Sequence, residues 1–276
     1  MSWDRQITIK SPDEIAIMRE AGRINAEALA AAHAVIRPGA TTADVNAAVE
    51  EVLKKYGVYS PFKNYPGPYP YPASSCVSVN DELVHGIPNP KRKLQQGDIV
   101  SVDCGTVYEG FVADSAFTAP VGEVSEQVKK LLYVTEQALF VGIAQMMPGK
   151  RVGDVSSAIQ KFVEGNGFYV TRIYTGHGVG RQMHEGPQVP NYGSPGRGML
   201  LRRGMTIALE PMVLIGTPET KVLSDQWTVA SRDGSYTAHF EHTVAVTEDG
   251  PMILTLLDDG RNPWQVEAGH ILYRSV

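Results

Sequence analysis

Two stretches of the sequence, RPGATTADVNAAVEEVLKKYG (residues 37–57) and MPGKRVGDVSSAIQKFVEGNG (residues 147–167), follow one pattern 110 positions apart. Both begin with Pro-Gly, which ends a preceding helix, and continue with an Asp-Val pair and apolar residues at helical spacing. Both close on a glycine of the kind that ends a helix. Upstream, Ala28-Leu29 matches Ala138-Leu139 at the same offset. A run of matches at a single offset indicates an internal duplication.

The helices of the first half have clear boundary signals. Ser11 and Glu14 form a capping box around Pro12, so we expect a helix from there that ends before Pro38-Gly39. A second helix is predicted over residues 42–56 and ends at Gly57.

The duplication continues downstream, where the loops differ in length. HGIP (residues 85–88) matches HEGP (residues 184–187). Leu-x-x-Gly precedes an apolar run at residues 94–97 and again at residues 201–204. Each half therefore predicts two helices, a histidine turn and a strand.

Both predicted strands end in a carboxylate. We expect them over residues 98–102 and 205–209, ending at Asp103 and Glu210. The fold class is therefore α+β, with a central antiparallel sheet in two halves, outer helices and a pseudo-twofold axis at a shared site. We predict one domain over residues 1–276, with half-repeats at about 11–120 and 121–256 and a tail at 257–276.

The composition excludes several classes of protein. The chain has 276 residues, of which 43% are hydrophobic, so it can bury a core. Its net charge of −5 argues against nucleic-acid binding by charge, and its two cysteines leave no disulfide framework. The N-terminus lacks the apolar segment of a signal peptide, and no run of 18 apolar residues exists. We expect a soluble, cytoplasmic protein without a membrane span.

Asp103 and Asp114 flank a predicted hairpin. If Glu109-Gly110 is a two-residue turn, residue 114 lies opposite residue 105, on the same strand face as residue 103. The two aspartates are then diagonal neighbours, and their carboxylates repel unless a cation or a proton lies between them. The alternative is a pair of surface aspartates in a polar hairpin.

Two glutamates and a histidine complete an oxygen-rich donor set. Glu210 ends an apolar strand, and Glu241 lies in another strand-like run. His177 stands in a glycine-rich loop that lacks the lysine and the following helix of a phosphate site. Four carboxylates and one histidine suffice for two divalent ions.

Two further histidines flank Glu241. Strand alternation places His239 on the same face as Glu241 and His242 on the opposite face. For this pair we favour a structural interpretation, with one histidine packed and the other solvated.

Five motifs occur in order over about residues 7–256: HGIP (85–88), DCGTVYEGFVAD (103–114), GHGVGRQMHEGP (176–187), ALEPM (208–212) and FEHTVAVTEDG (240–250). Together they resemble the methionine aminopeptidase family, in its bacterial type I form. The resemblance implies the pita-bread fold, whose two halves are related by a pseudo-twofold axis. It also implies metal ligands at Asp103, Asp114, His177, Glu210 and Glu241.

The resemblance further implies a reaction and roles for three side chains. The family removes the N-terminal methionine of nascent proteins with a small second residue. A metal-activated water attacks the peptide, and Glu210 is the general base. His85 and His184 are catalytic neighbours rather than ligands: His184 stabilises the oxyanion, and His85 contacts the scissile nitrogen. Two divalent ions are implied, with Co, Mn, Fe or Zn as candidates, because the donor set does not select one metal.

The resemblance places a methionine pocket at Tyr71, Cys76, Met183 and Trp227. Many relatives carry an aromatic residue where this chain has Met183. The Pro-rich segment at residues 61–72 is longer than the rim loop of the family, and either Tyr65 or Tyr69 replaces its second tyrosine. A partner-binding polyproline segment is the other interpretation, but the segment leads directly into Cys76, which favours a stiff pocket rim.

Two other functions stay open. An X-Pro exopeptidase of the same fold would share the donor set, and a release assay on dipeptides would distinguish it. A non-catalytic, ribosome-associated protein of this fold would lack some of the metal ligands, whereas this sequence has all five. The expected partners are peptides with an N-terminal methionine. The ribosome is a candidate partner, a monomer is favoured, and nucleic acid and membranes are not expected.

Overall fold

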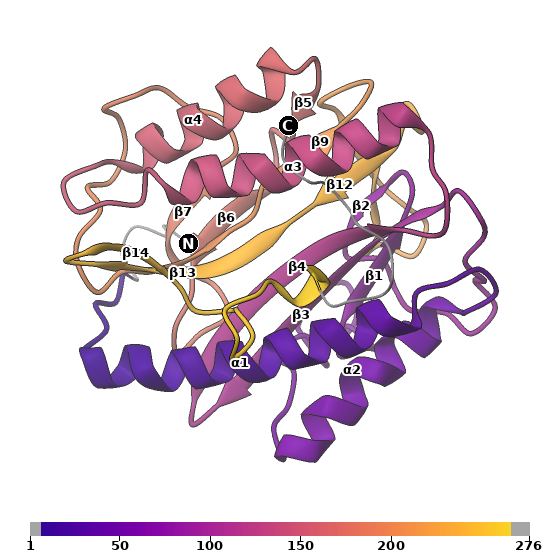
Figure 1. The fold of residues 1–276 in the computed structure, drawn as a ribbon, viewed down its shortest axis with the longest axis horizontal. Helices are drawn as coiled ribbons and strands as arrows, with labels where there is room; N and C mark the ends of the chain where they lie inside the picture. Colours follow the sequence, from indigo (N-terminus) through magenta and orange to yellow (C-terminus); the bar gives the residue numbers. More distant parts are fainter. Residues whose placement is uncertain (1–6, 266–276) are drawn as a thin grey trace.

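The computed structural model describes residues 7–265. Four helices lie on the outside of a curved antiparallel sheet (Figure 1). The helices are α1 (Pro12–Val35), α2 (Thr42–Tyr56), α3 (Glu126–Ile143) and α4 (Val152–Gly165). The strands of the first half are β1 (Cys76–Val79), β2 (Glu82–Val84), β3 (Ile99–Tyr108) and β4 (Phe111–Pro120).

The second half contributes more strands and a short helix near the end of the described chain. The strands are β5 (Tyr169–Val170), β6 (Thr175–Gly178), β7 (Glu185–Pro190), β8 (Thr206–Leu209), β9 (Met212–Leu214), β10 (Thr220–Val222), β11 (Val229–Ser231), β12 (Thr237–His239), β13 (Glu241–Thr247) and β14 (Gly250–Ile253). The short helix is a 3-10 helix, η2 (Pro263–Gln265). No helix within residues 7–265 combines the length and the apolar character needed to cross a bilayer.

The two predicted first-half helices have the expected bounds. The Ser11 hydroxyl accepts the Glu14 backbone N–H, and Glu14 in turn accepts the Ser11 N–H, so the capping box is formed. α2 spans residues 42–56 and ends at Gly57, whose φ of 65° is the left-handed conformation of a helix C-cap. These boundaries were predictable because caps and helix stops depend on local residues.

The same contacts recur in both halves at matched residues. Gly39 donates its backbone N–H to the Leu94 carbonyl at 2.8 Å, and Gly149 donates to the Leu201 carbonyl at 3.1 Å. The φ angles of the two glycines are 91° and 87°. Each Pro-Gly turn therefore binds the segment that precedes the carboxylate strand of its own half.

The strand order of the large sheet joins the two halves. The order is β1-β3-β4-β13-β8-β6-β7, with β14 paired to β13, and all these pairings are antiparallel. β4 of the first half lies beside β13 of the second half, while α1 and α3 cover the sheet from outside (Figure 1). The predicted α+β class, with a central antiparallel sheet and outer helices, is confirmed.

The hairpin of β3 and β4 has the predicted register. Tyr108 pairs with Phe111, and Gly105 pairs with Asp114. Both turn residues have positive φ, 47° at Glu109 and 77° at Gly110, as a two-residue hairpin turn requires. One detail of the prediction is wrong: β3 does not end at Asp103 but continues to Tyr108, because its ladder with β4 runs unbroken to the turn.

The described part of the predicted tail docks on the body of the protein. The Trp264 indole N–H donates to Glu136 of α3 at 2.7 Å, and its ring packs beside Phe117 and Phe240. Arg19 of α1 donates to three backbone carbonyls between residues 254 and 257. The segment from residue 254 to 265 therefore contacts helices of both halves. Tyr273, the other aromatic residue of the tail, lies outside the described residues.

Candidate metal centre

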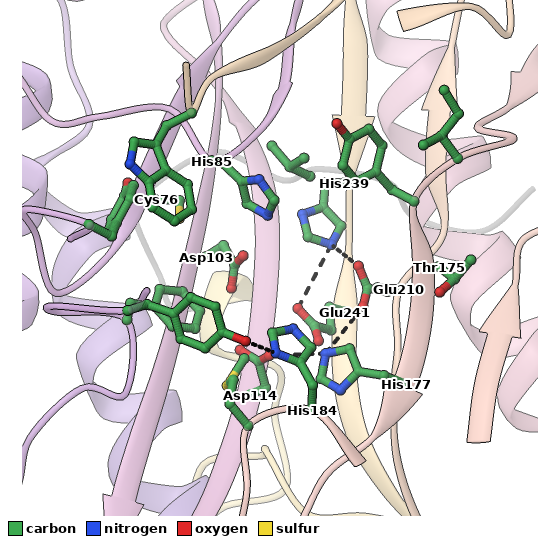
Figure 2. A pocket seen from close by; sticks show the side chains of 18 residues that line it. Cys76, His85, Asp103, Asp114, Thr175, His177, His184, Glu210, His239 and Glu241 are labelled. Carbon is green, nitrogen blue, oxygen red and sulfur yellow. Dashed lines mark hydrogen bonds and ion pairs between the residues drawn. The ribbon is translucent and has the colours of Figure 1, made fainter. Parts of the chain in front are cut away.

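A cavity of about 310 Å³ opens between the two halves. All the site residues expected from the sequence line it together (Figure 2): His85, His184, Asp103, Asp114, His177, Glu210, Glu241, Tyr71, Cys76, Met183 and Trp227. Seven other side chains complete the lining: Phe62, Tyr65, Val84, Ile173, Tyr174, Thr175 and His239.

The two aspartates come from the paired strands β3 and β4. Asp103 lies on β3, diagonal to Asp114 on β4, as the register requires. The backbone of Asp114 is fixed from β13, because the Thr243 hydroxyl accepts its N–H at 2.9 Å and donates to its carbonyl at 2.8 Å. This double hydrogen bond holds the β4 side of the site against the strand that carries Glu241.

The two glutamates lie where paired strands are interrupted. Glu210 and Pro211 separate β8 from β9, and Phe240 separates β12 from β13. Asn191 bridges the first interruption: its amide N–H donates to the Glu210 carbonyl at 3.0 Å, and its side-chain oxygen accepts the backbone N–H of Met212 at 2.7 Å. Asn191 has no signal in the sequence, because only the tertiary structure brings residue 191 beside this break.

His177 presents one ring nitrogen to the carboxylates. Its Nδ1 lies 2.9 Å from the Gly178 carbonyl, which makes Nδ1 the donor and leaves the lone pair on Nε2. Nε2 lies 3.8 Å from Asp114 and 3.5 Å from Glu210. Burial and then the neighbouring His184 lower the pKa of His177 to about 3, so this ring is neutral.

The carboxylates repel one another in the absence of a cation. Burial raises the pKa of Asp103 to about 7. Burial and the charges of neighbouring carboxylates raise the pKa values of Asp114, Glu210 and Glu241 well above their usual range. Such shifts show that several negative charges share one poorly solvated space.

The donor atoms fit a divalent cation. Ligand atoms of Asp114, His177 and Glu241 all lie within 4.8 Å of one another. Within residues 7–265, a buried oxygen of Asp103, one of Asp114 and one of Glu241 have no hydrogen-bond partner. Buried carboxylate oxygens without partners are costly, and a bound cation would satisfy them.

His85 and His184 lie on either side of this donor set. The Nδ1 atom of His184 is 2.7 Å from the Tyr65 hydroxyl, and its ring lies 4.4 Å from that of His177. His85 has a φ of 62°, and its imidazole lines the cavity (Figure 2). Burial lowers the pKa of each histidine to about 4, so both rings are neutral near pH 7.

An apolar wall lies at the other side of the cavity. The Tyr71 and Trp227 rings meet edge to face at 5.2 Å, and the Tyr71 hydroxyl donates to the Gly86 carbonyl at 2.8 Å. Cys76 and Met183 belong to the same apolar cluster.

The Pro-rich segment forms the rim of this wall, as the preferred interpretation has it. Phe62, Tyr65 and Tyr71 of this segment line the cavity. Tyr65 rather than Tyr69 reaches the site. Tyr69 instead bonds the Asp225 carbonyl, and its own carbonyl accepts the Trp227 indole N–H.

The expectation for His239 and His242 was wrong, because neither histidine is solvated. His239 is 1% exposed and lines the cavity, and His242 is fully buried on the other face of the strand. Thr255 and Asn262 bond the two ring nitrogens of His242, and Trp264 stacks on its ring. The chain between residues 255 and 264 therefore covers the strand face that carries His242. Strand alternation places His239 on the same face as Glu241, and this was the sequence feature that could have assigned His239 to the site.

Comparisons with known proteins agree with this geometry. Residues 16–248 match the model of metallopeptidase family M24. A methionine aminopeptidase of Clostridium acetobutylicum is 48% identical over 252 residues, which cover 91% of this chain and all of the relative. The crystal structure of a methionine aminopeptidase from Thermotoga maritima has a TM-score of 0.88 and 51% identity, covering 90% of this chain and 99% of that one.

A more distant likeness separates fold from activity. The prolidase of Pyrococcus furiosus has a TM-score of 0.73 at 24% identity, covering 92% of this chain and 67% of that one, and thus shares the fold alone. Fold, donor set and relatives lead to one assignment. This chain belongs to metallopeptidase family M24, among its methionine aminopeptidases.

Proposed function

We propose that this protein is a metal-dependent aminopeptidase that removes the N-terminal methionine of proteins with a small second residue. The observation that carries the proposal is the convergence of four carboxylates and His177 in one cavity that an apolar cluster also lines. The relatives of similar length that are named methionine aminopeptidases support the same substrate.

The proposed ligands of two divalent ions are the predicted five: Asp103, Asp114, His177, Glu210 and Glu241. Asp114 and Glu241, whose ligand atoms lie within 4.8 Å of each other and of a His177 nitrogen, would hold the ions together with Asp103 and Glu210. Co, Mn, Fe and Zn are all candidates, since an oxygen-rich set with one imidazole suits each of them. Such ions supply a water of lowered pKa and polarise the substrate carbonyl.

The proton route is assigned to this chain's own side chains. Glu210 would accept the proton of the attacking water, because its carboxylate borders both the donor set and the open cavity. His184 would donate a hydrogen bond to the developing oxyanion, since Tyr65 engages its Nδ1 and orients the ring. His85, on the opposite wall, would contact the nitrogen of the scissile peptide.

The apolar wall would bind the methionine side chain. Tyr71, Cys76, Met183 and Trp227 offer flat and polarisable surfaces of the kind that a thioether contacts well. The donor set lines the same cavity, and the substrate's free amino group would lie against its carboxylates. This placement would confine cleavage to the first residue.

Release of the first residue from short peptides tests this proposal. We expect methionine from Met-Ala-Ser and no cleavage before proline in an X-Pro panel. The His177→Ala variant is the matched loss of function and should lower the rate at least ~100-fold, because the donor set loses its nitrogen. Cleavage of the X-Pro panel with Met-Ala-Ser untouched would instead establish the alternative exopeptidase.

The cellular setting is also a proposal. We infer a cytoplasmic, monomeric enzyme that works as a single catalytic domain on nascent chains, with the ribosome as a candidate partner. The sheet shared by both halves supports the single domain. Size-exclusion chromatography with light scattering would test the monomer.

A further inference from the structure

His239 is a buried imidazole that the five-ligand assignment leaves unused. It ends β12 and points into the cavity between Glu210 and Glu241 (Figure 2). Thr118 of β4 fixes its backbone, because the Thr118 hydroxyl accepts the His239 N–H at 2.9 Å and donates to its carbonyl at 2.8 Å. The ring is therefore presented to the site by two neighbouring strands.

Neither ring nitrogen of His239 has a hydrogen-bond partner among residues 7–265. The side chain is 2% exposed, so bulk water does not supply the missing partner. A buried polar group without a partner is costly and calls for a specific explanation. Here the groups that face the ring belong to the proposed reaction.

Glu210 lies between two imidazoles, one for each of its oxygens. Oε1 is 3.5 Å from Nε2 of His177, and Oε2 is 3.8 Å from Nε2 of His239. Nε2 of His177 carries a lone pair, because its Nδ1 bonds the Gly178 carbonyl. No such contact fixes the tautomer of His239, so its ring can present an N–H at Nε2.

We propose that His239 is a positioning residue that donates its Nε2–H to Oε2 of Glu210. This role rests on the proposed function, in which Glu210 is the base. The bond would hold Oε1 on the side of His177 and the other ligands. The 3.8 Å separation exceeds a hydrogen bond, but catalytic hydrogen bonds are often long in the unliganded state and shorten in the working complex.

The alternative is that His239 is itself a ligand. The compact group of ligand atoms within 4.8 Å contains Asp114, His177 and Glu241 but not His239. Nε2 of His239 lies 3.8 Å from Oε2 of Glu210 and also 3.8 Å from Oε2 of Glu241, so the ring borders this group from outside, which favours a donor to a ligand over a ligand. Such outer contacts orient the ligands and tune metal affinity.

Two substitutions separate these roles. His239→Gln keeps an N–H donor near the position of Nε2, whereas His239→Leu keeps the volume without the donor. His33→Leu is the matched control, because His33 packs edge to face on Phe117 and does not line the cavity. Each variant is titrated as metal-free protein with Co²⁺ by calorimetry and absorption, and then assayed on Met-Ala-Ser.

We expect His239→Leu to weaken Co²⁺ binding about tenfold and to lower kcat about tenfold or more, with KM within about twofold. His239→Gln should restore both quantities to within about threefold of the wild type, because it restores the donor. His33→Leu should leave both unchanged.

Three results would overturn the proposal. Wild-type behaviour of His239→Leu would show that the ring is only packed. A His239→Gln variant as impaired as His239→Leu would show that the imidazole itself is needed, as for a ligand. Equal losses in His33→Leu would point to a general effect on folding. The Co²⁺ titration uses no peptide, so it decides this point even if the wild type releases no methionine.

Discussion

At the residue scale, the site is defined by charges that the fold brings together at a cost. Asp103 was identifiable from the sequence because hairpin geometry alone makes it a diagonal neighbour of Asp114. His239 was not assigned to the site, although its alternation with Glu241 placed both on one face. Strand alternation predicts which residues share a face of the strand. Which of the two faces borders a cavity depends on elements that are distant in the sequence.

The stability of the metal-free protein should depend on pH through Asp103. Its pKa is raised to about 7, above the value near 3.9 of an unfolded aspartate. A raised carboxyl pKa favours the protonated folded state, so its contribution is fully present below about pH 4 and is lost as the pH rises through about 7. Asp103→Asn removes this titration.

The metal-free variant should therefore gain stability over the metal-free wild type as the pH rises from 4 to 7, by about 1 kcal/mol or more, or about 2–4 °C in Tm. Thermal unfolding in the presence of a chelator at several pH values measures the difference. A difference in stability between the two proteins that stays constant across this pH range would show that burial does not raise the pKa of Asp103.

At the element scale, the duplicated turns and caps set the frame, and less predictable contacts fix the site on it. Gly39 and Gly149 occupy matched turns that the sequence repeat indicated. The contact of Lys10 with Glu185 had no such signal, since a lysine before the first helix resembles an ordinary surface charge. In the structure Lys10 lies 2.6 Å from Glu185, and both side chains are 3% exposed.

This ion pair should stabilise the turn that carries His184. Lys10→Met leaves the Glu185 charge buried without its cation and should cost about 3–5 kcal/mol of unfolding free energy. The double variant Lys10→Met/Glu185→Leu removes both charges and should be less destabilised than the single one. Urea unfolding of the wild type, the two single variants Lys10→Met and Glu185→Leu, and the double variant measures this. A double variant whose loss equals the sum of the two single losses would exclude coupling between the pair.

At the scale of the whole molecule, the two halves share one sheet, and the segment from residue 254 to 265 ties them from outside. The sequence indicated the shared site but not this tie, because nothing local to Trp264 specifies its contact with Glu136 of α3. The same segment covers His242, which explains why neither histidine of the pair is solvated, although one of the two was predicted to be.

Trp264→Ala should therefore destabilise the protein by about 2–3 kcal/mol, because it empties a half-buried space against Phe117 and His242. Trp264→Phe should recover most of the loss but not the hydrogen bond to Glu136. Chemical denaturation is the measurement, and Tyr192→Ala, at an exposed position, is the comparison. Equal stability of Trp264→Ala and the wild type would show that the contacts of Trp264 do not stabilise the fold.

In the proposed reaction, the buried carboxylates and His177 hold divalent ions for the release of N-terminal methionine. The most direct measurement is the rate of methionine release from Met-Ala-Ser by metal-free protein, as Mn²⁺, Co²⁺, Fe²⁺ or Zn²⁺ is added in turn. We predict no release in the presence of a chelator and a rate that rises with at least one ion until about two ions are bound per chain. Undiminished release by the chelated protein, or no release with any ion, would contradict the account.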